Sequence, residues 1–247
     1  MPNSRTLAEP PVVRAALAAQ ALALRDAVRA LDEAELALPT RLGDWRVREL
    51  AAHLAIQVGW VPLHVDDPAP DGPLLGLTAW VAAVRSAADL LDEAARRHAA
   101  EVFAGPTAAV AAAFDEAVDL LTDFLAGPRA ADAGRRFGLR FGPIALGDML
   151  VTRLVETVVH ADDLAHALGR SRFPHDTRAV AAVSALLLAA LAERAAGADV
   201  VDAVAAADVV DRAEKLAAAD PLAWIRVATG RDPVPADLPA GLLPLLG

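Results

Sequence analysis

Alanine and leucine recur at spacings of three and four residues through most of the chain, and this pattern restricts the possible folds more than any other feature. Such spacing puts apolar side chains on one face of an α-helix, whereas a half-buried strand alternates at every second residue. Proline and glycine are confined to a few clusters, which mark loops between the periodic segments. The sequence therefore predicts a mainly α protein with a helix bundle as its default architecture.

The proline and glycine clusters give the expected limits of the helices. We expect helices over residues 11–31, 44–60, 77–101, 107–127, 144–168 and 175–196. Asp44 is placed to act as the N-cap of the second helix, and Gly169 is placed to cap the fifth. Segments 62–73 and 129–143 are rich in proline or glycine and predict irregular loops.

The periodic pattern weakens after Gly197. Residues 198–210 are rich in valine, alanine and aspartate and are compatible with short strands or a frayed helix. A further short helix is expected to open at Pro221, followed by an extended tail. We therefore predict two parts, a helical bundle at residues 1–172 and a small α or α+β C-terminal domain at residues 173–247.

The charge balance excludes several classes of partner. The chain has a formal net charge of −10 and a sequence pI of about 5.0. Nucleic acids and anionic membranes both require a basic face that displaces counterions, so neither is an expected partner. The apolar stretch at residues 179–192 is shorter than the roughly 20 residues of a membrane-spanning helix, and no basic leader precedes an apolar run. We therefore expect a soluble cytoplasmic protein.

Cysteine and tyrosine are absent from the sequence. The absence of cysteine excludes disulfides, thiolate metal ligands and a cysteine nucleophile. Because the thiolate is the reactive form of sulfur, any thiol chemistry must use a thiol from outside the chain.

The segment from Arg153 to Leu164 is the most informative for function. On a helix, Glu156, His160 and Asp163 fall within about 60° of one another. The remaining positions are mostly Leu, Val and Ala, which indicates a central, buried helix. A carboxylate and an imidazole one turn apart in such a helix need a partner. A divalent cation would supply one, and a Glu–His hydrogen bond or a solvated polar stripe is the alternative.

A third ligand would have to come from another helix. His53 lies in a second apolar segment, between Ala52 and Leu54. Alone it would be a satisfied core histidine, but with Glu156 and His160 it completes a set of two imidazoles and one carboxylate. Three protein ligands and an open fourth position are the catalytic form of zinc. The same set suits ferrous iron, and nickel or manganese as well.

Two segments carry a resemblance to a known family. Asp44–Leu54 reads D-W-R-V-R-E-L-A-A-H-L, and Arg153–Ala165 reads R-L-V-E-T-V-V-H-A-D-D-L-A. Both resemble signature segments of the mycothiol-dependent maleylpyruvate isomerase family, a branch of the DinB-like metal-binding four-helix bundles. The resemblance covers about residues 10–170 and implies a DinB-like four-helix bundle with extra helices. It also implies a divalent metal, zinc above all, with nickel or iron as alternatives. The implied ligands are His53, Glu156 and His160.

The resemblance implies a function as well. The open coordination position would bind the sulfur of a small-molecule thiol such as mycothiol, which would attack a small electrophile. Addition, rotation and elimination would give cis–trans isomerisation, whereas addition alone would give thiol transfer. The alternatives are a metal-stabilised binding or carrier protein without turnover, and a site that holds no metal. Either a monomer or a homodimer is compatible with these hypotheses.

The C-terminal part departs from the isomerases. Residues 191–197 and 220–231 are similar to the tail of actinobacterial proteins labelled sterol-carrier-like, which join this bundle to a small carrier-type domain. The stretch between these two segments is short for a lipid-binding sheet and tunnel. The tail therefore resembles a shortened carrier module.

Several further residues are candidates for supporting roles. Asp163 would either accept a hydrogen bond from His160 and orient it, or cap nearby backbone. Arg153 lies at the margin of the same helical stripe. Arg140, in the glycine-rich loop, is a candidate clamp for an anionic substrate, with ordinary solvation as the alternative. Arg231 is a candidate to reach the mouth of the site from the C-terminal part.

The other histidines and one glutamate favour simpler interpretations. Glu49, one turn before His53, would suggest a second metal, but its arginine neighbours favour a solvated face. The histidines that we expect at the surface or in a loop are His64, His98, His166 and His175.

Overall fold

In the computed structural model, the described residues are 9–87, 97, 106–170, 173–197, 203–236, 238 and 241–246. The elements follow one another as α1 (Pro10–Arg29), α2 (Glu33–Leu36), α3 (Val47–His64), α4 (Leu77–Ser86), α6 (Thr107–Ala126), a 3-10 turn (Pro128–Ala131), β1 (Arg136–Leu139), β2 (Gly142–Ala145), α7 (Leu146–Ala167), α8 (Thr177–Gly197), α9 (Ala203–Ala219) and α10 (Pro221–Ala228).

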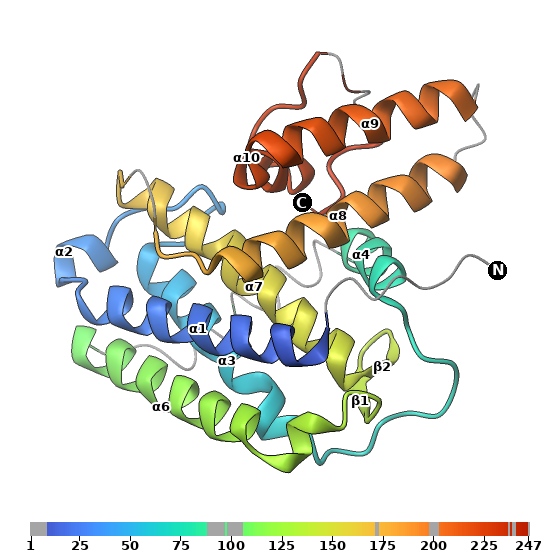
Figure 1. The fold of residues 1–247 in the computed structure, drawn as a ribbon. Helices are drawn as coiled ribbons and strands as arrows, with labels where there is room; N and C mark the ends of the chain where they lie inside the picture. Colours follow the sequence, from blue (N-terminus) through green and yellow to red (C-terminus); the bar gives the residue numbers. More distant parts are fainter. Residues whose placement is uncertain are drawn as a thin grey trace.

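Four of the helices, α1, α3, α6 and α7, form a bundle (Figure 1). Both α1 and α3 pack against α6 and α7, so each helix has two neighbours around a common core. Leu17, Leu54, Phe114 and Leu154 contribute one fully buried side chain from each helix. The predicted class, a mainly α DinB-like bundle with a small C-terminal appendage, is confirmed.

The helix α7 is the central element of the molecule. It contacts α1, α3, α8 and both strands, which explains why its sequence is apolar on almost every side. Its buried polar residues include Arg153, Asp162 and Asp163. The helix ends at Ala167, and Gly169, the residue predicted to terminate it, has φ of 62°. The N–H of Arg170 then donates to the oxygen of Ala165 at 2.9 Å, the long hydrogen bond of a glycine-terminated helix.

The helix α3 begins later than predicted. The expected N-cap, Asp44, precedes an extended residue, Arg46, and the helix starts at Val47. The reason is that the carboxylate of Glu49 reaches back and accepts the main-chain N–H of Arg46 at 2.9 Å, which satisfies one of the unpaired donors at the helix start.

The far end of α3 also differs from the prediction. The helix continues through Pro62 to His64, so the predicted loop at 62–73 begins later. Pro62 lies in the last turn, where it removes only one main-chain hydrogen bond. The third predicted helix, 77–101, begins as predicted with α4 at Leu77. Most of its residues beyond Ala87 lie outside the described part of the chain.

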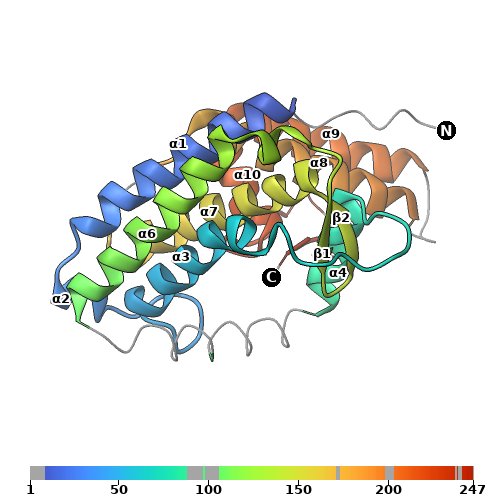
Figure 2. The ribbon, with the colours of Figure 1, turned by 90° about the horizontal axis from the view of Figure 1, so that it is seen from below.

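The predicted irregular loop at 129–143 is largely ordered as a β-hairpin (Figure 2). Strands β1 and β2 pair antiparallel, with Arg136 opposite Ala145. Phe137 and Ile144 turn inward and are buried. The hairpin leads directly into α7 and thereby fixes the start of that helix.

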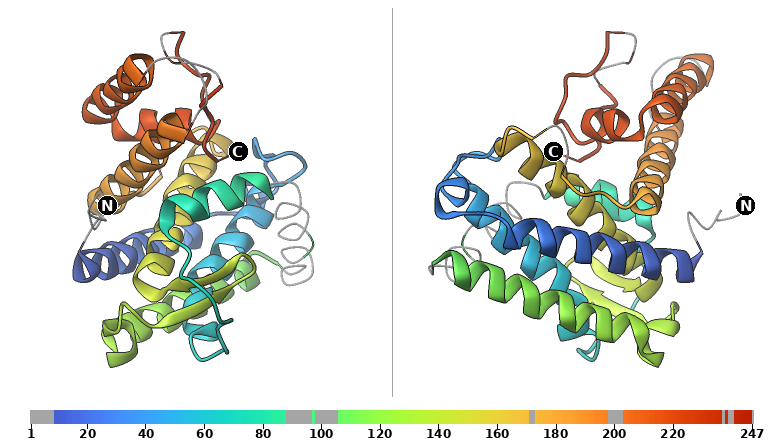
Figure 3. Two further views of the ribbon diagram at one scale, coloured as in Figure 1. Left: turned by 90° about the vertical axis from the view of Figure 1, so that its right-hand side faces the viewer. Right: turned by 60° about the vertical axis from the view of Figure 1, so that its left-hand side comes forward.

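The C-terminal helices stack on one side of the bundle (Figure 3). Helix α8 packs on α1, α4 and α7, while α9 and α10 pack against α8. The expectation of strands or a frayed helix at 198–210 is wrong from Ala203 onward, where α9 is a regular helix. Alanine has the highest helix propensity, and burial of Val209 and Ala213 in the core fixes the outcome. The predicted division at residue 172 stays a prediction.

Among the described residues, α8 is the one helix that is long and apolar enough to cross a membrane. The whole of α8 has 21 residues and is long enough, although the apolar stretch within it at residues 179–192 is shorter. The helix is mostly buried inside the protein, against α1, α4, α7, α9 and α10. The indole of Trp224 in α10 donates to the main-chain oxygen of Ser184 at 3.3 Å. These contacts are those of a core helix.

Candidate metal centre

Three potential metal ligands converge between α3 and α7. His53 Nε2 lies 3.2 Å from Glu156 Oε2, and His160 Nε2 lies 3.4 Å from the same oxygen. One nitrogen from each histidine and one oxygen of Glu156 all lie within 4.8 Å of one another. The two residues on α7 share a face because they are four positions apart, and the packing of α3 on α7 brings His53 to that face.

The spacing of these atoms fits a single divalent ion. Ligands about 2.1 Å from a tetrahedral zinc ion lie about 3.4 Å from one another. The two nitrogen–oxygen distances at Glu156 are close to this value. The imidazole rings of His53 and His160 are 5.0 Å apart between centroids and nearly perpendicular, at 89°. Two imidazoles and a carboxylate are also ligand types that zinc, iron and nickel accept.

His53 is buried and packs against an aromatic ring on one side. Its side chain is buried in α3, and the ring of Trp45 meets it edge-on with 5.2 Å between centroids. Burial lowers the pKa of His53, although the nearby Glu156 carboxylate opposes the shift. A neutral imidazole can offer a lone pair to an ion without first losing a proton.

Asp163 holds His160 from the opposite side of its ring. The Asp163 side chain is fully buried, and its Oδ2 lies 2.8 Å from His160 Nδ1. A carboxylate at that distance keeps the proton on Nδ1 and directs Nε2 towards Glu156. Of the two roles predicted for Asp163, the structure therefore shows the contact with His160.

The charges of the site are strongly coupled. Burial disfavours the cationic form of His160, but hydrogen bonds with Asp163 and Glu156 outweigh it and raise the pKa of His160 to about 9. Burial would raise the pKa of Glu156, yet hydrogen bonds from His160 and His53 and the charge of Arg153 hold it well below its usual value. The pKa of Asp163 is likewise lowered, because His160 and Arg231 outweigh its burial.

An ion-pair network that was not predicted from the sequence lies next to this cluster. Arg41 donates from Nε to Asp163 at 2.6 Å and from Nη2 to Asp162 at 2.7 Å. Arg226 of α10 also pairs with Asp162, at 2.6 Å. The sequence feature that could have predicted this network is the pair of adjacent aspartates in an otherwise apolar helix, because buried carboxylates require cationic partners.

The arginines predicted near the site take different positions. Arg231 reaches Asp163, with its Nη2 at 3.2 Å from Oδ2, so the C-terminal part does contribute a side chain beside the cluster. Arg153 is buried and donates to Gln57 of α3. Arg140 is exposed at the turn of the hairpin. His160 lies fourteen residues along α7 from its start beside that hairpin, or about 20 Å, so the structure does not bring Arg140 to the cluster.

The remaining candidates lie outside the cluster. His64 ends α3 and pairs with Asp67 at 2.7 Å, and His166 is exposed as expected. The expectation of a surface position is wrong for His175, which is half-buried and donates to the oxygen of Val158 at 3.1 Å. The prediction for His98 lies outside the described residues. Glu49, as noted above, serves the start of α3.

A helical bundle in which two histidines and a glutamate meet between two of its helices defines the DinB-like class. Residues 17–165 match the family model described as the mycothiol maleylpyruvate isomerase N-terminal domain. The chain belongs to this family. No curated protein and no solved structure gives a significant match.

The matched range determines what the family assignment covers. It contains the cluster residues on α3 and α7, together with Asp163, and it ends near the end of α7. Helices α8, α9 and α10 lie beyond it. The likeness of the tail to sterol-carrier-like proteins therefore stays a prediction.

Proposed function

We propose that the chain is a cytoplasmic protein that binds one divalent metal ion through His53, Glu156 and His160, with zinc as the expected ion. The observation that carries this proposal is the convergence of three ligand atoms from two helices at the spacing of a single coordination sphere. The family assignment supports it, because all three residues lie within the matched range. Iron and nickel are the alternatives for the same ligand set.

The residues around the ligands have supporting roles in this proposal. Asp163 orients His160 through Nδ1 and increases the basicity of Nε2. Arg41 and Arg231 neutralise the buried carboxylate of Asp163. Trp45 packs against His53 and keeps water from that side of the site. These contacts hold the side chains of the ligands in position for an ion.

We further propose that the protein uses a small external thiol, of the mycothiol type, to act on a small electrophile. A bound divalent ion supplies stabilisation of a thiolate, which is the nucleophilic form of sulfur. The chain itself has no cysteine, so the sulfur must arrive with a cosubstrate. His53, Glu156 and His160 would leave one coordination position open for it. Isomerisation of an activated double bond and thiol transfer are both compatible with this arrangement.

The metal assignment is tested by elemental analysis of protein purified without a metal-binding tag. Wild-type protein is expected to hold about one equivalent of zinc, iron or nickel, as a site with one set of ligands requires. His160→Ala should lose most of it. His166→Ala is the matched control, because it removes an exposed histidine from the same helix. Full retention of metal in His160→Ala would overturn the ligand assignment.

The catalytic part of the proposal has a separate test. Turnover of an activated electrophile should depend on the added thiol, disappear after chelation and return when zinc is restored. His53→Ala should be inactive under the same conditions, and His166→Ala should be active. Thiol-dependent turnover that persists without metal would place the chemistry elsewhere.

A second candidate is a binding protein in which the metal only stabilises the bundle. It is favoured by one observation: two cations beside the cluster, Arg41 and Arg231, are already paired with Asp163 and are not free for a substrate. In that case chelation should lower the melting temperature, and no thiol-dependent turnover should be found at any metal loading.

A further inference from the structure

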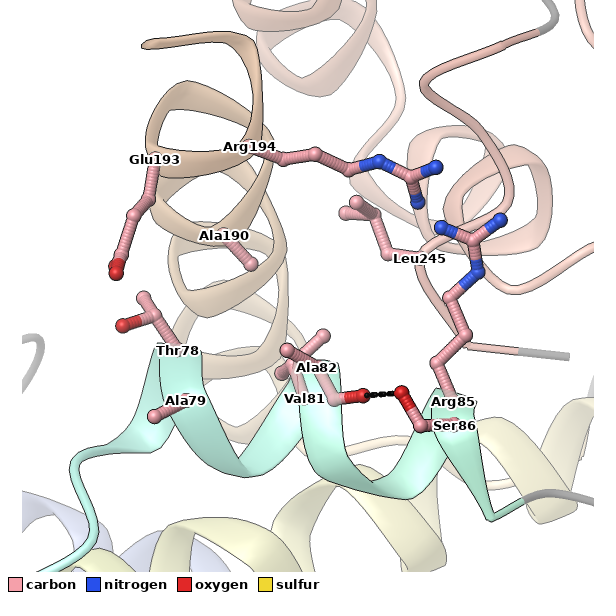
Figure 4. A pocket seen from close by; sticks show the side chains of 10 residues that line it. All are labelled: Thr78, Ala79, Val81, Ala82, Arg85, Ser86, Ala190, Glu193, Arg194 and Leu245. Atoms are coloured by element: carbon pink, nitrogen blue, oxygen red, sulfur yellow. Dashed lines mark hydrogen bonds between the residues drawn. The ribbon is translucent and has the colours of Figure 1, made fainter. Parts of the chain in front are cut away.

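A cavity of about 380 Å³ lies between α4, α8 and the C-terminal segment (Figure 4). Its volume falls within the range of small-molecule sites, which is about 300–1,000 Å³. None of the residues that line it belongs to α3 or α7, so it is separate from the proposed metal centre.

Two guanidinium groups lie on the same side of this cavity. Arg85 extends from α4 and Arg194 from α8, and Figure 4 shows both groups beside Leu245. Arg194 donates to the main-chain oxygen of Gly241 at 2.9 Å. Within the described part of the chain, neither guanidinium has a carboxylate in salt-bridge distance. Two neighbouring cations without a counter-charge favour an anion that bridges them.

The other walls limit what the rest of the ligand can be. Val81, Ala190 and Leu245 line the cavity with apolar atoms. The carboxylate of Glu193 lies on the side opposite the two guanidinium groups, near Thr78 (Figure 4). A negative charge there repels a second anionic group on the ligand.

We propose that this cavity binds an organic monocarboxylate with an apolar body. The carboxylate contacts Arg85 and Arg194, and the apolar chain lies on Val81, Ala190 and Leu245. Glu193 excludes dicarboxylates of the same length. This inference does not depend on the metal site or on its proposed activity.

Calorimetric titration of the full-length protein with sodium octanoate tests the charged end of the site. The protein is used metal-free, so that carboxylate cannot bind to an ion at the other site. Arg85→Gln is the informative variant, because the Arg85 guanidinium makes no hydrogen bond or ion pair within the described residues. It should weaken octanoate binding about tenfold or more, as expected for the loss of a charge-assisted hydrogen bond.

Arg178→Gln is the matched control, since it removes the same charge from the other end of α8. Its affinity for octanoate should equal that of the wild type. Equal affinity of Arg85→Gln and wild-type protein would overturn the proposal. A wild-type protein that does not bind octanoate overturns it as well.

A second variant tests whether the ligand enters the cavity. Ala82 is exposed and lines the opening, so Ala82→Phe fills the space and leaves both arginines in place. It should abolish octanoate binding. Undiminished binding in Ala82→Phe shows that the anion stays outside and contradicts the proposal.

The selectivity is tested with octanedioate, which adds a second carboxylate at the far end. Wild-type protein should bind it more weakly than octanoate, and Glu193→Gln should narrow the difference. Equal binding of the two ligands by wild-type protein would overturn the assignment of Glu193.

Discussion

The two polar regions of the molecule differ in how their charges are neutralised. On α7, Asp163 is fully buried and contacts His160, Arg41 and Arg231. At the cavity between α4 and α8, Arg85 is exposed and pairs with no carboxylate within the described residues. In the first region the protein's own cations compensate the carboxylate, and their contacts fix the orientation of His160 that an ion with a strict geometry requires. The second is open and leaves part of its charge to be supplied by a ligand.

The two regions also differ in the free-energy cost of removing their charged groups from water. A buried carboxylate must be compensated by the protein itself, because water does not reach it. An exposed guanidinium stays hydrated and needs no partner until a ligand displaces the water. We therefore expect substitutions at the α7 network to lower the stability of the fold, together with metal affinity where they touch His160, and substitutions at the cavity to change binding alone.

The largest effect is expected for Asp163→Asn. Removal of this charge leaves His160, Arg41 and Arg231 without their common partner, and loss of one member of a buried ion network costs about 3–5 kcal/mol of unfolding free energy. Zinc affinity should fall about tenfold to a hundredfold, because His160 loses its orienting contact. Urea unfolding and competition with a chromogenic chelator measure the two effects.

Asp211→Asn is the control for this substitution. Asp211 also forms an ion pair, with Lys215 at 2.6 Å, but both side chains are exposed. A surface pair of this kind contributes about 0–1 kcal/mol. If the two variants lose the same stability, the contrast between the buried and the exposed region is wrong.

The fold could be predicted where local pattern and tertiary packing agree. The periodicity of α7 and the glycine after it give its length, because a buried helix shows apolar residues on all sides. The hairpin escaped prediction because β1 and β2 are four residues each and carry few buried side chains. The alanine-rich start of α9 suits several structures, and only the packing of Val209 and Ala213 selects a helix.

The residues of the candidate site also differ in whether the sequence predicts them. His53, Glu156 and His160 could be proposed together because spacing pairs the last two, His53 in a second apolar segment completes the ligand set, and the family resemblance implies the same three residues. Arg41 lies more than a hundred residues from its partner Asp163, and such a contact leaves no local pattern. Arg140 stays apart from the cluster because the glycine-rich loop forms a hairpin at the other end of α7.

A smaller effect is expected for Arg226→Met, which removes a contact between α10 and the end of α7. Arg226 donates from both Nε and Nη2 to Asp162, and Arg41 keeps that carboxylate partly compensated. The loss of unfolding free energy should be about 1.5–3 kcal/mol, the usual range for hydrogen bonds to charged groups. Metal content should be unchanged, because Asp163 and not Asp162 contacts His160.

Arg178→Met gives the comparison for this variant. It breaks an ion pair with Asp176 in which the arginine is half exposed, at 48% of its side chain, so its effect should stay below about 1 kcal/mol. Loss of metal from Arg226→Met would show that the contact between α10 and α7 also sustains the metal site.

The smallest effect concerns pH and the junction between α7 and α8, where His175 donates to Val158. Burial lowers the pKa of His175, although the hydrogen bond to Val158 opposes the shift. In the unfolded chain a histidine titrates near pH 6.5. Below that pH the unfolded state takes up a proton that the folded state resists, so this residue reduces stability as the pH falls towards its folded pKa.

His175→Gln should therefore lose less stability than wild-type protein between pH 7.5 and pH 5, measured by urea unfolding of the metal-free proteins. A variant with the same pH dependence as wild-type protein would show that His175 is protonated without cost and that the junction is more open to water than its contacts indicate.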